Sequence, residues 1–139
     1  MDDTLDMSII YDLFKKDRFA VENDMKITKA EPGYAEARME IGDKHLNGYG
    51  SVQGGAMFTL ADYAFAAASN AKGYATVSSG ASISFFHPPK GSYITAKAQE
   101  VSSGRKLCTY NVDIFDEFGT LVARYTGSGY IKNIKITDI

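Results

Sequence analysis

The chain has 139 residues, of which 45% are hydrophobic and 23% charged, and its formal net charge is -2. This length predicts one domain over residues 1–139, with enough chain to bury a hydrophobic core. The nearly balanced charge and the lack of a basic tract give no reason to expect that the protein binds nucleic acid. No apolar run is long enough to cross a bilayer, and the acidic start is unlike a signal peptide, so we expect a cytoplasmic protein that is not bound to a membrane.

The first part of the chain predicts one helix and two strands. Apolar residues recur at helical spacing over residues 3–16, and Asp2 or Thr4 can cap the start of this short helix. Strand-like patterns follow at Met25–Glu31 and Tyr34–Ile41, with a proline-glycine turn between them.

A polar, glycine-rich loop over Asp43–Gln53 leads into an alanine-rich segment that predicts a helix from about Gly54 to Ala71, ending near Gly73. One face of this helix is small and apolar, which lets a sheet approach closely. Its members are Leu60, Ala64, Ala67, Ala68 and Ala71, with Met57 and Ala61 beside them. A polar band lies on one side of the helix and is explained equally well by a solvated face or by a site. That band contains Thr59, Asp62, Tyr63, Ser69 and Asn70.

From Tyr74 onward the pattern changes to a period of two. Four strands are expected, at residues 74–86, 93–102, 106–115 and 121–132. Because the connections are short and rich in turn residues, we expect these strands to form an antiparallel meander. Two strands, one long helix and four strands indicate an α+β fold, in which a curved antiparallel sheet of about six strands wraps a central helix.

The start of the long helix and one carboxylate within it suggest acyl-transfer chemistry. Gly54 and Gly55 would offer backbone N–H groups at a helix N-terminus, as an oxyanion hole requires, although a tight turn explains the same glycines. Asp62 is a candidate nucleophile or general base. It follows Gly54 by eight residues, or about 12 Å along a helix axis. If both act on one carbonyl, they must come from different chains, which predicts a dimer with shared sites.

The spacing His45-x-Asn47-x-x-Gly50-x-x-Gln53-Gly54-Gly55, with Asp62 seven residues further on, resembles the hotdog-fold acyl-CoA thioesterases of the phenylacetate-degradation (PaaI) type. The segment Ser82–Gly91 and the Gly104-Arg105 turn are similar to the same family, and the resemblance covers about residues 40–132. It implies a hotdog fold and the hydrolysis of an acyl-CoA to a free acid and CoA without a cofactor. It also implies Asp62 as the catalytic carboxylate and a homodimer or homotetramer.

The resemblance extends to further residues of the site. Asn47 would position the thioester carbonyl, although Asn-Gly is also a strong turn dipeptide. Ser78 would hold water or the acidic residue, with the adjacent Ser79 as the alternative. The other loop residues expected on the substrate side are His45, Gln53 and Gly55. The family usually has histidine where Gln53 stands, and glutamine can exchange hydrogen bonds but cannot titrate.

Coenzyme A is heavily anionic, so a site for it needs cations. Lys90, Arg105 and Lys106 lie at turns and are the candidates for the phosphate end, although solvated turn charges explain each of them as well. The two histidines, His45 and His87, have no Cys or His at metal-ligand spacing, so no metal site is expected.

Two alternatives to a thioesterase stay open at this stage. A non-catalytic acyl-CoA-binding module would explain the loss of the usual histidine, although the chain keeps the acidic residue on the helix. A hotdog dehydratase would need a histidine and a carboxylate together at the helix start, and Gln53 argues against it. The sequence leaves both aryl and aliphatic acyl groups open.

Overall fold

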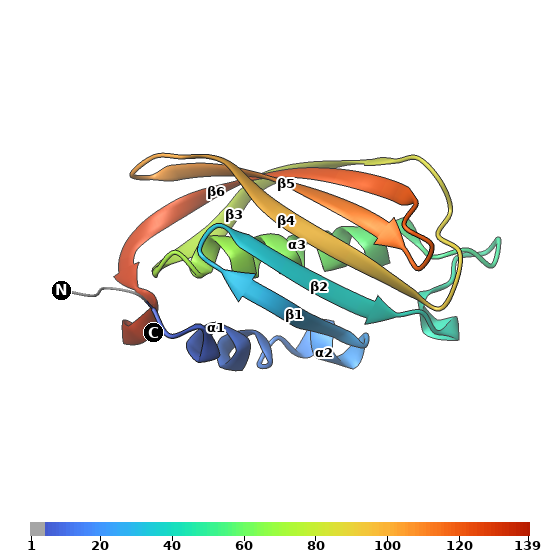
Figure 1. Ribbon diagram of the computed structural model, residues 1–139, viewed down its shortest axis with the longest axis horizontal. Helices are drawn as coiled ribbons and strands as arrows, with labels where there is room; N and C mark the ends of the chain where they lie inside the picture. The colour runs from blue at the N-terminus through green and yellow to red at the C-terminus, as the bar shows by residue number, and fades with distance from the viewer. Residues whose placement is uncertain (1–4) are drawn as a thin grey trace.

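The computed structural model describes residues 5–139, in which six strands form one curved sheet around the long helix α3 (Gly54–Asn70) (Figure 1). The strands are β1 (Met25–Glu31), β2 (Tyr34–Glu40), β3 (Tyr74–Phe85), β4 (Tyr93–Ser103), β5 (Leu107–Asp116) and β6 (Leu121–Lys135). Their order in the sheet is β1-β2-β4-β5-β6-β3, and every neighbouring pair is antiparallel. The predicted α+β architecture, with one central helix and about six strands, is therefore confirmed.

The small apolar face of α3 packs against the concave side of the sheet. All of the residues predicted for this face are buried, and the helix contacts each of the six strands. Most of the predicted polar band is buried as well and serves the fold. Asn70 accepts from the Thr76 N–H (2.9 Å) and donates to the Thr76 carbonyl (3.2 Å), which ties the helix end to β3. The Tyr63 hydroxyl donates to the Phe14 carbonyl (2.6 Å), and Asp62 is only half-buried.

The predicted four-strand meander is wrong at its first step. Strands β4, β5 and β6 are sequential neighbours, but β3 pairs with β6 and forms an edge of the sheet. The seven residues between β3 and β4, 86–92, contain Pro88-Pro89, which lack the N–H groups that a hairpin ladder uses. The chain therefore leaves β3 and crosses to the far half of the sheet, where β4 pairs with β2 (Figure 1).

The N-terminal region is broken into two short helices that lie below β1 in Figure 1. Helix α1 (Met7–Phe14) begins later than predicted because the Asp6 side chain caps it by accepting from the Ser8 N–H. The predicted caps Asp2 and Thr4 lie outside the described residues. Helix α2 (Arg18–Glu22), which is capped by Asp17, was not predicted. Two short 3-10 helices, Asp43–His45 and Ile136–Asp138, complete the secondary structure of the described residues. Within residues 5–139, no helix is long and apolar enough to cross a membrane.

Candidate active site

The loop before α3 is organised by one asparagine. The Asn47 side-chain oxygen accepts from the N–H groups of Tyr49 (2.9 Å) and Ser51 (3.1 Å), and its backbone N–H donates to the Ser51 carbonyl (2.7 Å). Its side-chain nitrogen has no acceptor among the described residues, and the residue is exposed. Asn47 therefore both forms the turn and keeps an amide donor available for a ligand.

The start of α3 leaves one of its two glycine N–H groups without a partner. Gln53 is the N-cap, with extended backbone, and its side-chain oxygen accepts from the Gly55 N–H (2.5 Å). The Gly54 N–H has no acceptor within residues 5–139. Because the helix dipole favours negative charge at this end, the Gly54 N–H can bind an oxyanion. Gln53 therefore caps the helix through its side-chain oxygen.

A cavity of about 320 Å³ opens beside this helix start and is lined by Gly54, Asn47, Phe85 and His87, among others. The ring of Phe85 lies against Gly54, because a Cβ added at residue 54 would be 3.0 Å from the Phe85 Cζ. Gly54 and Asn47, which each keep a donor without a partner among the described residues, therefore border the same cavity. Asp62 of the same chain does not line it.

Asp62 lies further along α3 and is bonded to the sheet. The Tyr125 hydroxyl donates to its Oδ1 at 2.8 Å, and Tyr125 is fully buried. Burial and the neighbouring negative charge of Asp62 raise the pKa of Tyr125, so the phenol stays protonated and remains a donor. The Ser78 hydroxyl also lies next to the Tyr125 hydroxyl and acts on that pKa in the opposite direction. The structure thus brings Ser78 and Asp62 to one tyrosine, and Ser79 falls at an irregularity in the β3–β6 pairing.

His45 is placed inside the molecule. It is 2% exposed; its Nδ1 accepts from the Gly42 N–H (2.9 Å), and its Nε2 bonds to the Asn23 carbonyl (2.9 Å). Both ring nitrogens are therefore used within the chain, and the ring anchors the loop to the segment before β1. His45 also borders a cavity of about 350 Å³ together with Gln53 and Gly55, so the structure brings these three predicted residues to one place. Among the described residues, no three His, Cys, Asp or Glu side chains gather as a metal site would require.

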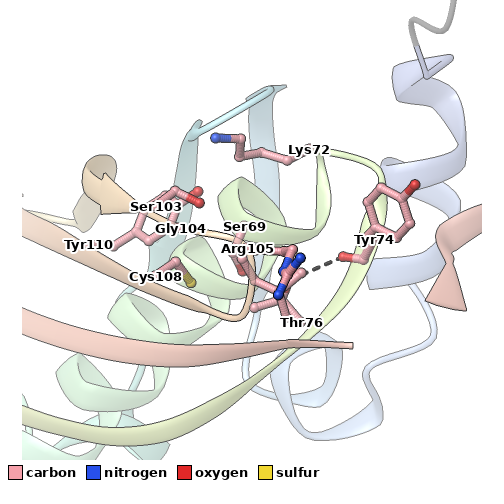
Figure 2. A pocket seen from close by; sticks show the side chains of 10 residues that line it. Ser69, Lys72, Tyr74, Thr76, Ser103, Gly104, Arg105, Cys108 and Tyr110 are labelled. Atoms are coloured by element: carbon pink, nitrogen blue, oxygen red, sulfur yellow. Dashed lines mark hydrogen bonds between the residues drawn. The ribbon is translucent and has the colours of Figure 1, made fainter. Parts of the chain in front are cut away.

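The three candidate cations are not brought together in one chain. Lys90 precedes β4, and its N–H donates to the Asp116 carboxylate (3.1 Å). Arg105 and Lys106 follow β4, whose 11 residues span roughly 35 Å. Arg105 borders a cavity of about 340 Å³ together with Tyr74 (Figure 2), and Lys106 lines a neighbouring cavity of about 520 Å³ that Arg105 also borders.

Two residues of the site were missed by the sequence analysis. Tyr125 falls in a predicted strand, where alternation indicates a core residue, but its bond to Asp62 joins positions 63 residues apart. His87 is considered in the sequence only as a metal ligand, and the packing of the β3–β4 connection places it on the Gly54 cavity. No sequence pattern marks either contact, because each depends on how distant segments pack.

Comparison with known proteins places the chain in a family. The sequence pattern of the thioesterase superfamily matches residues 49–123. The acyl-coenzyme A thioesterase PaaI of Escherichia coli K12 is 33% identical over 119 residues, which are 85% of this chain and 85% of that protein. The solved structure of E. coli PaaI superimposes with a TM-score of 0.87 at 29% identity, covering 92% of this chain and 94% of that one.

Two further similar structures were solved with a coenzyme A ligand. A hypothetical thioesterase protein of Streptococcus pneumoniae with coenzyme A has a TM-score of 0.79 at 27% identity and covers 86% of this chain and 96% of its own. The smu.793 protein of Streptococcus mutans, bound to acetyl CoA, has a TM-score of 0.74 at 26% identity. The match covers 78% of this chain and 88% of that one. The fold, the helix-start donors and these similarities lead to one conclusion: the chain belongs to the thioesterase superfamily and is a thioester hydrolase with the PaaI-like hotdog fold.

Proposed function

We propose that this protein hydrolyses acyl-CoA thioesters at sites shared between two subunits. The observation that carries the proposal is that the candidate oxyanion donor and the candidate carboxylate lie apart within one chain. The Gly54 N–H and the Asn47 amide border one cavity, whereas Asp62 lies elsewhere on α3 and is bonded to Tyr125. A complete site therefore needs Asp62 from one subunit and Gly54 from the other.

The chemistry follows from these groups. The thioester carbonyl oxygen accepts from the Gly54 N–H, and the Asn47 amide fixes its orientation, so that negative charge developing on this oxygen is stabilised. Asp62 of the other subunit either attacks the carbonyl carbon or removes a proton from an attacking water. Collapse of the tetrahedral intermediate breaks the carbon–sulfur bond. On the route of direct attack this leaves an anhydride between the acyl group and Asp62, which water then hydrolyses to free the carboxylate. The net reaction consumes one water and releases the free acid and the CoA thiol.

The exposed edge of the sheet supports a homodimer. Strand β3 pairs only with β6, and its outer edge is unpaired among the described residues. Long unpaired edges invite pairing with another strand, and Val77 on β3 is 44% exposed. Antiparallel pairing of β3 with β3 of a second copy puts the start of one strand beside the end of the other. The Ser78 side of one subunit then approaches the Phe85 and Gly54 side of its partner.

The same pairing suggests where the CoA phosphates bind. It would bring Arg105 and Lys106, beside the start of β3, toward Lys90, which follows the end of β3 in the other subunit. Three cations that are far apart in one chain could then converge on one anionic ligand. The relatives solved with coenzyme A and acetyl CoA support a CoA thioester as the substrate class.

The first test removes the oxyanion donor alone. Gly54 is the first residue of α3, a position that accepts proline, and Gln53 has the extended backbone (ψ 137°) that a residue before proline requires. Gly54→Pro removes the N–H, whereas the control Gly54→Ala keeps it and adds the same Cβ beside Phe85. We expect Gly54→Pro to lower kcat about 100- to 1,000-fold and Gly54→Ala to retain most of it. Equal activity of the two variants would contradict the oxyanion role.

Activity is measured as thiol release from a panel of aryl and aliphatic acyl-CoAs. Cys108 will not interfere with the thiol reagent, because it is buried and burial raises the pKa of its thiol. Asp62→Asn should abolish turnover while the fold is retained. Absence of turnover by the wild type on every substrate, together with binding of acyl-CoA, would instead indicate a binding module.

A mixing experiment tests the shared site. Asp62→Asn and Gly54→Pro subunits each have at most about 1% of wild-type activity alone, but a mixed dimer contains one site with both groups intact. Random re-association of equal amounts should restore about a quarter of wild-type activity if the sites are shared across a two-fold interface. No recovery, with mixed dimers shown by mass, would place both groups of a site in one subunit.

A further inference from the structure

We propose that Tyr125 is a positioning residue for Asp62 and that Gly127 exists to let the tyrosine ring reach it. The inference rests on the proposed function, because it concerns the same carboxylate. The contact on which it depends is the 2.8 Å hydrogen bond from the Tyr125 hydroxyl to the Asp62 Oδ1. Tyr125 does not act on the substrate in this scheme, and its effect is exerted through the carboxylate.

The ring of Tyr125 is held by the helix that carries Asp62. It packs edge-on against Phe58, with ring centroids 5.4 Å apart at 72°, and against Phe65 at 6.3 Å and 49°. Phe58 lies four residues before Asp62 and Phe65 three residues after it, so the two rings flank the carboxylate on α3. This packing orders the hydroxyl before any substrate binds, and a preordered donor fixes the carboxylate without a further entropic cost.

Gly127 supplies the space for this ring position. It lies two residues after Tyr125 on the same inward face of β6 and is buried. A Cβ at residue 127 would lie 2.6 Å from the Tyr125 Cε1 and 2.8 Å from its hydroxyl oxygen, so any side chain there must displace the ring. The Tyr125 ring and its hydroxyl therefore occupy the space that a side chain at residue 127 would need.

The bond has a defined consequence for the chemistry. One carboxylate oxygen is held by the phenol, so the other is left to face the carbonyl or the water. A donor also stabilises the ionised form of a half-buried carboxylate. The groups that act on Tyr125 here are the Asp62 charge and the Ser78 hydroxyl, and no salt bridge among the described residues involves Asp62. The tyrosine is therefore the one side-chain donor to this carboxylate within residues 5–139.

The chain contains a matched control for this experiment. Tyr110 is also fully buried and packs edge-on against the same Phe65, with centroids 5.3 Å apart at 83°. Its hydroxyl has no hydrogen-bond partner among the described residues. Tyr125→Phe and Tyr110→Phe therefore remove the same atom from similar surroundings, and only the first removes a donor from Asp62.

The test compares kcat and KM for both variants in the full-length protein, with acyl-CoA as substrate. For Tyr125→Phe we expect kcat to fall about 10- to 100-fold, the range of a hydrogen bond to a charged group, with KM nearly unchanged. The loss should appear in kcat alone, because the carboxylate loses its fixed orientation while the groups that bind the substrate are unchanged. Tyr110→Phe should retain the wild-type kcat and KM.

The proposal is overturned if Tyr125→Phe keeps the wild-type kcat, or if Tyr110→Phe shows the same loss. The first result would make the bond incidental, and the second would make the effect one of core packing. If Tyr125→Phe does not fold, Gly127→Ala keeps the phenol but displaces it and should give the same loss of kcat with KM nearly unchanged. A wild type that hydrolyses no thioester would refute the proposed function itself, whereas an active wild type with Asp62→Asn inactive and Tyr125→Phe unchanged would refute only this inference.

Discussion

Replacing Gln53 with alanine tests what this residue does at the position where the family usually has histidine. The substitution removes the side-chain oxygen that accepts from the Gly55 N–H at 2.5 Å and leaves the Gly54 N–H unchanged. If Gln53 is only the cap of α3, the variant should lose some stability and little activity. If Gln53 contacts the substrate, the balance should be the reverse.

The magnitude follows from the exposure of the cap. Loss of a good N-cap costs about 0.5–2 kcal/mol of unfolding free energy, and Gln53 is exposed, so water replaces part of the lost bond. We therefore expect a loss of about 0.5–1 kcal/mol. With an unfolding entropy of about 2.1 cal/mol/K per residue, a chain of this length should show a Tm lower by about 2–3 °C. The first helical turn would loosen, and kcat should fall less than about tenfold.

The assay measures Tm at one fixed protein concentration and thiol release across pH. Gln53→Ser, which restores an N-cap, serves as the control and should recover most of the lost stability. The shape of the pH–rate profile should be the same in all three proteins, since neither glutamine nor its replacements titrate. An activity loss as large as that of Gly54→Pro with an unchanged Tm would refute the capping role.

Two further variants, one single and one double, have defined expectations. Tyr110→Phe should raise the unfolding free energy by about 1 kcal/mol, because it removes a buried hydroxyl without a partner; a clear loss of stability on denaturant unfolding would contradict this. Arg105→Ala combined with Lys106→Ala should raise KM for acyl-CoA with kcat unchanged, since these cations would bind the phosphates. The same variant should not change KM for acyl-pantetheine thioesters, which lack the nucleotide, and an equal rise for both substrates would argue against the phosphate role.

The sequence alone predicted the helices and strands that depend on residues only a few positions apart. The helix that begins at Gly54 and its small apolar face follow from residues three and four positions apart, which meet on one side of any helix. Most strand limits follow from alternation in the same way. The candidate site was predicted in part for the same reason, because the Gly54 donor and the Asp62 carboxylate belong to one continuous motif.

Tertiary structure decided the features that depend on distant parts of the chain. Strand β3 lies beside β6 instead of β4, Tyr125 bonds to Asp62 across 63 residues, and His45 is buried as an anchor. Lys90 and Arg105 are separated by the length of β4. Spacing along the chain cannot reveal such contacts, because which strands pair and which side chains meet is settled by the packing free energy of the whole sheet around the helix, to which every element contributes.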